Sequence, residues 1–293
     1  MLSFMKQVGR EFSEDDCPRM AAALAYYTAF SLAPLMILLL LLAGLVLDPS
    51  DVQGKIETQV ASVVGSDGAQ QIRTMLQSAS KPEAGSLPGI LSAVGLFFGA
   101  SGVVIQLQKA LNDAWEVKPD PEQGGLWNFV TKRLFSIGMI LGLAFVLVVS
   151  MAMSTVIAAL DQQIVALLPA QLGEGAANAI DLSVTVVVLT LIFAAIFKVL
   201  PDAEVRWRDV MVGALLTAIL FVIGKFAMGM YLGSKNMEST FGAAGSLALI
   251  LLWVYYSGMI LLFGAEFTQV WAKRRGKGIT PEEGAVRVHE HVE

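Results

Sequence analysis

The sequence is poor in the residues that build most metal and nucleophilic sites. Its 293 residues contain one cysteine, Cys17, and two histidines, His289 and His291, which lie in the last five residues. A zinc site needs several such ligands, and a cysteine nucleophile needs a histidine base nearby. The phosphate-binding motif G-x-x-x-x-G-K-[ST] is also absent from the sequence. We therefore expect no metal site, no cofactor and no enzymatic activity.

Charge is scarce as well, and six long segments contain almost none of it. The chain has 20 basic and 25 acidic residues, but only Lys198, Lys225 and Glu266 fall within these segments. The segments are residues 21–47, 88–108, 134–160, 182–200, 210–232 and 241–272. Because about 20 apolar residues cross a membrane as a helix, the sequence predicts an all-α, polytopic integral membrane protein with six transmembrane helices. A soluble enzyme, a disordered chain and a disulfide-rich secreted domain are excluded.

The distribution of basic residues predicts the orientation of these spans. Fifteen of the 20 basic residues fall on the side that carries both termini, four fall on the other side, and Lys225 lies within a span. Since cytoplasmic loops are enriched in Lys and Arg, we expect both termini in the cytoplasm. A net charge of −5 argues against nucleic acid as a partner.

The predicted spans divide the chain into three parts. Residues 1–20 form a cytoplasmic N-terminal segment, residues 21–272 form the membrane domain, and residues 273–293 form a polar, disordered cytoplasmic tail. The outer loop 48–87 opens with Asp48 and Pro49, a favourable helix start, and then has apolar residues at helical spacing. Two amphipathic helices are predicted there.

Charges within a membrane span are costly, and each is a candidate functional residue. Lys225 lies in the outer half of the fifth span; it either reaches outward to the interface or faces a cavity and meets an anionic headgroup. Glu266 lies in the inner half of the last span. It either pairs structurally with Lys198, Arg206 or Arg208 or has a role in proton or substrate coupling.

The first span holds further candidates for a substrate path or gate, which are Tyr27, Ser31 and Pro34. A proline within a helix removes a backbone hydrogen bond and bends the helix, and a nearby hydroxyl can satisfy the freed groups. Bent helices often line pathways in transporters. Proline is also common in membrane helices generally, so both interpretations stay open.

Three blocks of sequence resemble the YihY/BrkB family of bacterial inner-membrane proteins. They are the stretch from Ala23 to Pro34, the stretch from Phe197 to Asp202, and the stretch from Leu251 to Glu266 with its Trp-Val-Tyr-Tyr and Phe-Gly-Ala-Glu motifs. The resemblance implies a protein of the bacterial inner (cytoplasmic) membrane with six membrane helices and cytoplasmic ends. It also implies a role in handling lipids or envelope precursors. An older name of the family is ribonuclease BN, but the residues of a nuclease site are missing here. The positions that match the family motifs are Tyr27, Ser31, Pro34, Lys198, Pro201, Trp253, Tyr256, Gly264 and Glu266.

Two functions from different classes fit these features. The first is export or flipping of an amphipathic anionic substrate, with Lys225 attracting the headgroup and Glu266 acting as an inner gate. The second is a non-transporting membrane scaffold that recruits envelope partners through loop 48–87. The partners expected are membrane lipids and envelope proteins, with a homo-oligomer left open and ribonuclease activity not expected.

Overall fold

The computed structural model describes residues 2–43, 87–120, 138, 170–233, 243–275, 278–282 and 284–288. Within these ranges the chain is mainly helical. The helices are α1 (Leu2–Glu14), α2 (Cys17–Ala43), α4 (Leu87–Ala114), α6 (Ala170–Val199), α7 (Trp207–Gly233) and α9 (Ala243–Arg274). The strands are β1 (Val117–Pro119), β2 (Ala203–Glu204), β3 (Thr280–Pro281) and β4 (Ala285–Arg287).

In the part of the chain that the structure describes, three helices are long and apolar enough to cross a membrane. Their candidate spans are Leu182–Val199 in α6, Trp207–Ala227 in α7 and Ile250–Arg274 in α9, which coincide with three spans predicted from the sequence. Helices α2 and α4 cover most of two more predicted spans. The predicted span 134–160 and the outer loop 48–87 lie almost entirely outside the described residues, so the count of six spans stays a prediction, as does the orientation of the termini.

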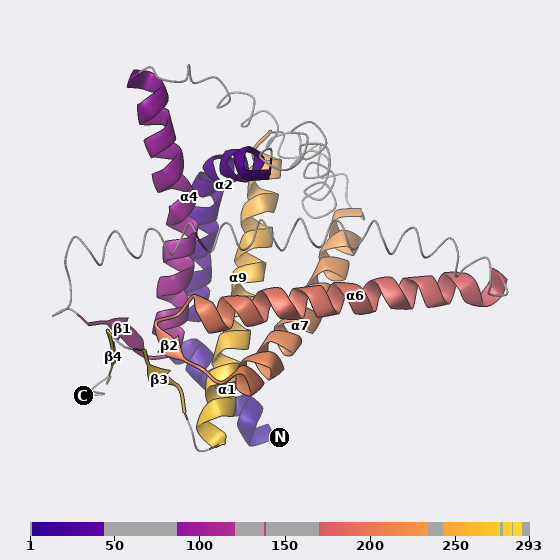
Figure 1. Cartoon of the computed structure of the whole chain (residues 1–293). Coiled ribbons are helices and arrows are strands. Elements are labelled where there is room, and N and C mark those ends of the chain that lie inside the picture. Colours follow the sequence, from indigo (N-terminus) through magenta and orange to yellow (C-terminus); the bar gives the residue numbers. More distant parts are fainter. Residues whose placement is uncertain are drawn as a thin grey trace.

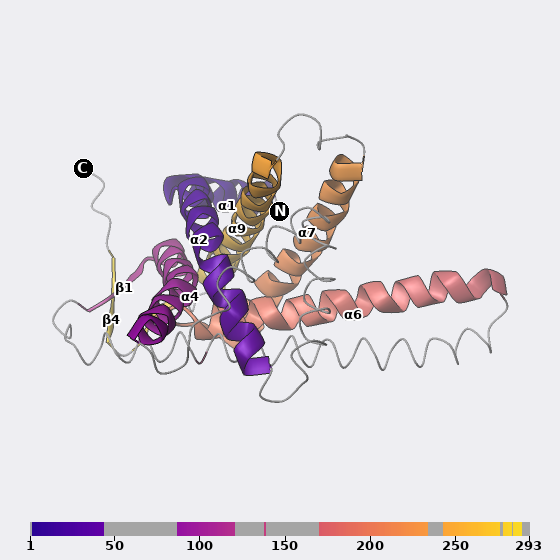
Figure 2. The same cartoon turned by 90° about the horizontal axis from the view of Figure 1, so that it is seen from above.

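The helices pack around α9. Helix α2 contacts both α4 and α9, and α7 contacts both α6 and α9. Figures 1 and 2 show α6 running across the other long helices instead of alongside them. Helix α2 changes direction along its length in the same views, as a proline within the helix is expected to cause. The start of α1, the end of α9 and the strand pairs all lie at one end of the bundle (Figure 1).

Helices α7 and α9 approach closely because small residues alternate with threonines at their contact. A Cβ atom added to Gly213 would collide with Thr268, and one added to Gly264 would collide with Thr217. Each threonine hydroxyl donates a hydrogen bond to a backbone carbonyl one turn earlier, at 2.8 Å for Thr217 and 2.7 Å for Thr268. Small-residue contacts of this kind are how membrane helices gain packing energy without a hydrophobic effect.

Helix α1 lies against the C-terminal half of α9. The rings of Phe4 and Phe267 meet edge to face at 5.0 Å, those of Phe12 and Phe263 at 5.9 Å, and Val8 between them is buried. The guanidinium of Arg274 lies over the ring of Phe4 at 5.0 Å. These contacts attach the N-terminal segment to the last predicted span.

The chain after α9 differs from the disordered tail that we expected. Strand β4 pairs antiparallel with β1, and strand β3 pairs antiparallel with β2. The tail therefore connects the loop after α4 with the loop between α6 and α7. Pairing of this kind uses backbone N–H and C=O groups, of which proline lacks only the N–H, and so it leaves no apolar pattern in the sequence.

Candidate functional site

Glu266 lies at the contact between α9 and the junction of α1 with α2. Its side chain is fully buried, at 0% exposure. The Cys17 thiol donates a hydrogen bond to Glu266 Oε1 at 3.6 Å, and Asp15 interacts with the same carboxyl group. Within the described part of the chain Oε2 has no hydrogen-bond partner. Residues far apart in the sequence thus form one acidic cluster, which we call the Glu266 cluster: the buried Cys17 and Glu266 and the partly buried Asp15.

The predicted ion pair between Glu266 and Lys198, Arg206 or Arg208 is wrong. Among the described residues, none of these cations pairs with Glu266; the Lys198 ammonium instead donates to the Val205 carbonyl at 2.8 Å. Arg206 and Arg208 are exposed. Spacing along the sequence alone could not reveal this arrangement.

The junction between α1 and α2 positions Cys17. Asp16 adopts a positive φ of 51°, which reverses the chain after α1, and its carboxylate pairs with Arg19 at 2.9 Å. Pro18 occupies the first turn of α2, where its missing N–H is not needed. Burial contributes most to a raised pKa of the Cys17 thiol, and the neighbouring carboxyl groups of Glu266 and Asp15 raise it further. The thiol therefore stays protonated and acts as a hydrogen-bond donor.

Polar contacts attach α9 to the end of α4 beside the Glu266 cluster. The indole of Trp115 donates to the Ala265 carbonyl at 3.1 Å. Gln269 and Lys273 both donate to Glu116 Oε1, at 3.2 and 2.7 Å. The ammonium of Lys273 therefore pairs with Glu116 and not with Glu266.

A second polar network joins α4 to the turn between α6 and α7. The side chain of Asp202 accepts hydrogen bonds from Gln108 at 3.1 Å and from Asn112 at 2.8 Å, and its backbone N–H donates to Asn112 at 2.8 Å. We did not predict this network. A signal was present, because two amides four residues apart share one helix face, at the end of an apolar segment.

Lys225 and Glu266 occupy different environments. Lys225 is exposed on α7, and its neighbour Gly224 packs directly against Tyr256 of α9. Glu266 lies ten residues further along α9 than Tyr256, which corresponds to roughly 15 Å along a helix. The structure therefore does not bring the two charges together.

The candidates in the first span do not form one cluster with Glu266. Ser31 is buried against α4, where a Cβ on Gly102 would lie 3.2 Å from its hydroxyl. Tyr27 is 45% exposed and meets the Tyr26 ring edge to face at 5.9 Å. Pro34 lies within α2, but its side chain is outside the described set. Ser31 is thus part of a helix contact, whereas Tyr27 faces the surface.

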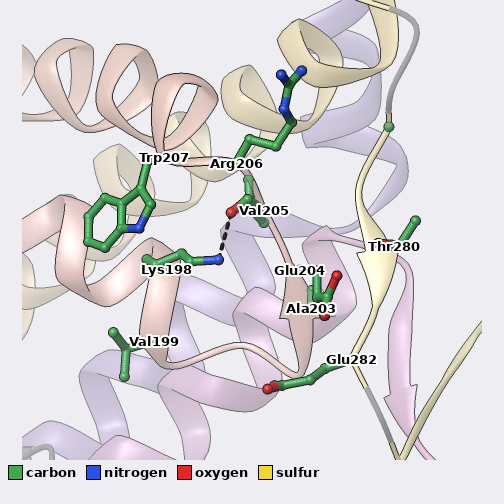
Figure 3. A pocket seen from close by; sticks show the side chains of 10 residues that line it. Lys198, Val199, Ala203, Glu204, Val205, Arg206, Trp207, Thr280 and Glu282 are labelled. Carbon is green, nitrogen blue, oxygen red and sulfur yellow. Dashed lines mark hydrogen bonds between the residues drawn. The ribbon is translucent and has the colours of Figure 1, made fainter.

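Lys198 borders a cavity of about 880 Å³ between the turn after α6 and strand β3. In the view of Figure 3, Lys198 and Trp207 lie on the side of the helices, and Glu204 lies beside β3. The charged residues that line the cavity are Lys198, Glu204, Arg206 and Glu282. We call it the α6–β3 cavity. Among the described residues no group of three His, Cys, Asp and Glu side chains is arranged to hold a metal ion.

Sequence comparison identifies the family to which this arrangement belongs. Residues 8–288 match the family model described as virulence factor BrkB. The chain belongs to the BrkB family. The family resemblance inferred from the three sequence blocks is therefore confirmed, and the match extends through the C-terminal strands.

Named relatives of this BrkB-family chain are described chiefly as membrane proteins. A UPF0761 membrane protein of Pseudomonas paraeruginosa is 26% identical over 281 residues, covering 93% of this chain and 65% of its own length. A ribonuclease-like protein, YfkH, of Bacillus subtilis is 27% identical over 280 residues, covering 94% of this chain and 97% of its own length. The chain thus spans just under two thirds of the Pseudomonas relative. No solved structure matches it.

Proposed function

We propose that this BrkB-family membrane protein exports or flips an amphipathic anionic substrate, such as a lipid or envelope precursor, across the bacterial inner membrane. The role is one of transport, not of enzymatic catalysis, and Glu266 serves as a proton-linked gate at the inner end. The observation that carries the proposal is the full burial of Glu266 beside Asp15 with no basic partner in the described chain.

Protonation is the simplest way to accommodate a carboxyl group in this place. The titratable groups facing Glu266 are Asp15, Glu11 and the Cys17 thiol, and none of them is basic. Three cations on the elements around Glu266 pair with other carboxylates: Arg10 with Glu11 and Glu14, Arg19 with Asp16, and Lys273 with Glu116. An unpaired buried charge costs several kcal/mol, so Glu266 is proposed to be neutral in this closed arrangement.

Loss of that proton would act directly on the contact between α2 and α9. It would place a carboxylate next to Asp15 in the turn that leads into α2, and like charges repel most strongly where water is excluded. Helix α2 packs on both α4 and α9, so its displacement would open the inner end of the bundle. Binding and release of a proton would then alternate the closed and open forms.

Lys225 supplies the outer part of this proposal. Its exposed position on α7 allows the ammonium to reach the interface and meet an anionic headgroup. The roughly 15 Å between its level and that of Glu266 assigns the two residues to different steps. Headgroup attraction would depend on Lys225, and the pH dependence of movement would depend on Glu266.

The test is transbilayer movement of a fluorescent anionic lipid in vesicles that contain the purified full-length protein. A membrane-impermeant quencher reports how much of the lipid has crossed. We expect movement to vary with pH in the wild type, to lose that pH dependence in Glu266→Gln, and to fall severalfold in Lys225→Ala for anionic lipids. Glu14→Gln and Lys118→Ala, at exposed positions, are the matched controls. If wild type and both variants are equally inactive with anionic lipids, the proposal is wrong.

A further inference from the structure

The α6–β3 cavity lies where two candidate spans end. Lys198 and Val199 are the last residues of the span Leu182–Val199, and Trp207 is the first residue of the span Trp207–Ala227. All three line the cavity. A cavity that joins the ends of two spans lies at the level of lipid headgroups, because the apolar segments on both sides of it occupy the hydrocarbon region.

The described residues that line this cavity carry charges of both signs, and these charges do not form ion pairs with one another. Lys198 and Arg206 are basic, and Glu204 and Glu282 are acidic. Among these four described side chains no ion pair is formed, and the Lys198 ammonium donates a hydrogen bond to the Val205 carbonyl. An ammonium has three donors, so Lys198 retains two for a ligand.

The lining also contains an exposed aromatic residue. Trp207 is 58% exposed, and Figure 3 shows its ring on the same side of the cavity as Lys198. Trp is enriched at the boundary between membrane and water, where its ring contacts lipid and its N–H stays hydrated. A ligand with an apolar part and a charged head fits this combination better than a small soluble ion does.

We propose that the α6–β3 cavity binds a phospholipid whose headgroup carries both a phosphate and an ammonium group, of the phosphoethanolamine type. Lys198 and Arg206 contact the phosphate, while Glu204 and Glu282 contact the ammonium. The volume of about 880 Å³ lies within the range of roughly 300–1,000 Å³ typical of ligand pockets. Since strand β3 forms one wall, the C-terminal segment is part of the binding site.

This inference goes beyond transport, because a bound lipid can be measured without any movement across the bilayer. The experiment is native mass spectrometry of the full-length protein released from nanodiscs that contain equal amounts of phosphatidylethanolamine and phosphatidylglycerol. We expect the wild type to retain phosphatidylethanolamine preferentially. The double variant Lys198→Gln/Arg206→Gln should lose retained lipid of both kinds by roughly tenfold, because charge-assisted hydrogen bonds to phosphate are removed.

Replacing the acidic pair distinguishes recognition of the headgroup from a merely structural role. Glu204→Gln/Glu282→Gln should shift retention from phosphatidylethanolamine toward phosphatidylglycerol by about fivefold, since the partners of the ammonium are lost while those of the phosphate remain. A merely structural role for these residues would lower retention of both lipids without changing the ratio. Both glutamates are exposed, so their replacement tests binding without disturbing a buried contact.

Lys118→Gln, at an exposed position in β1, serves as the control and should leave retention unchanged. Retention of phosphatidylethanolamine at wild-type level in both double variants would overturn the proposal. So would an unchanged lipid ratio in the acidic variant. Failure of the transport assay with intact lipid retention would refute the proposed function alone.

Discussion

Glu266 and Lys225 are equally unusual in the sequence, because each is a lone charge within a long apolar segment, yet the fold treats them in opposite ways. Glu266 is fully buried at a junction of three helices and contacts Cys17. Lys225 is exposed on the surface of α7. A short acidic side chain in the middle of a helix contact cannot reach water, whereas a lysine has a long apolar stem that brings its charge to the interface.

The largest effect expected from this comparison is on stability. Glu266→Ala should lower the free energy of unfolding by roughly 2–3 kcal/mol, because it opens a cavity and removes the acceptor of Cys17. Lys225→Ala should change it by less than about 0.5 kcal/mol, as is usual for exposed positions. Thermal unfolding of both variants in the same detergent measures the difference.

Glu266→Gln sharpens the same comparison. The amide keeps the volume and removes only the capacity to lose a proton, so we expect its unfolding temperature to equal or exceed that of the wild type. Unfolding as early as that of Glu266→Ala would mean that the carboxyl group is needed for stability, and the proton-linked gate would lose its support.

The sequence predicted those features that depend on local composition. The spans in α6, α7 and α9 follow from apolar length, and helix α1 could have been predicted from Phe4, Val8 and Phe12, which recur every four residues. The partner of Glu266 could not, since Cys17 is 249 positions away. Neither could the strands after α9, because backbone pairing places no requirement on side chains.

The rate at which Cys17 is labelled measures how well the Glu266 cluster is shielded from water. The expected effect is smaller than that on stability and more specific to this cluster. Since burial raises the pKa of the Cys17 thiol, the thiolate forms only above the usual range near 8.5. At pH 8 a water-soluble maleimide should label it at least about tenfold more slowly than a cysteine at position 13, introduced as Ser13→Cys in a Cys17→Ser background. Ser13 is exposed and lies four residues away.

The native chain has one cysteine, so each labelled protein reports a single position. Loss of the Phe4 contact in Phe4→Ala should speed labelling of Cys17 by loosening α1 from α9. Equal labelling rates for Cys17 and the cysteine at position 13 would show that the Glu266 cluster is open to water. The contrast between a buried Glu266 and an exposed Lys225 would then be wrong.

The smallest effect expected concerns Asp113, at the end of α4, whose pKa is raised by burial although Lys109, Lys118 and Arg19 oppose the shift. A raised pKa means that the folded state binds the proton more tightly than the unfolded state, so this residue contributes less to stability as the pH rises through that range. Asp113→Asn should therefore raise the unfolding temperature slightly at pH 8 and leave it unchanged at pH 3, where both states are protonated. Thermal unfolding at the two pH values tests the sign. A gain that is equal at both pH values would remove Asp113 from the set of acids that the fold prefers neutral.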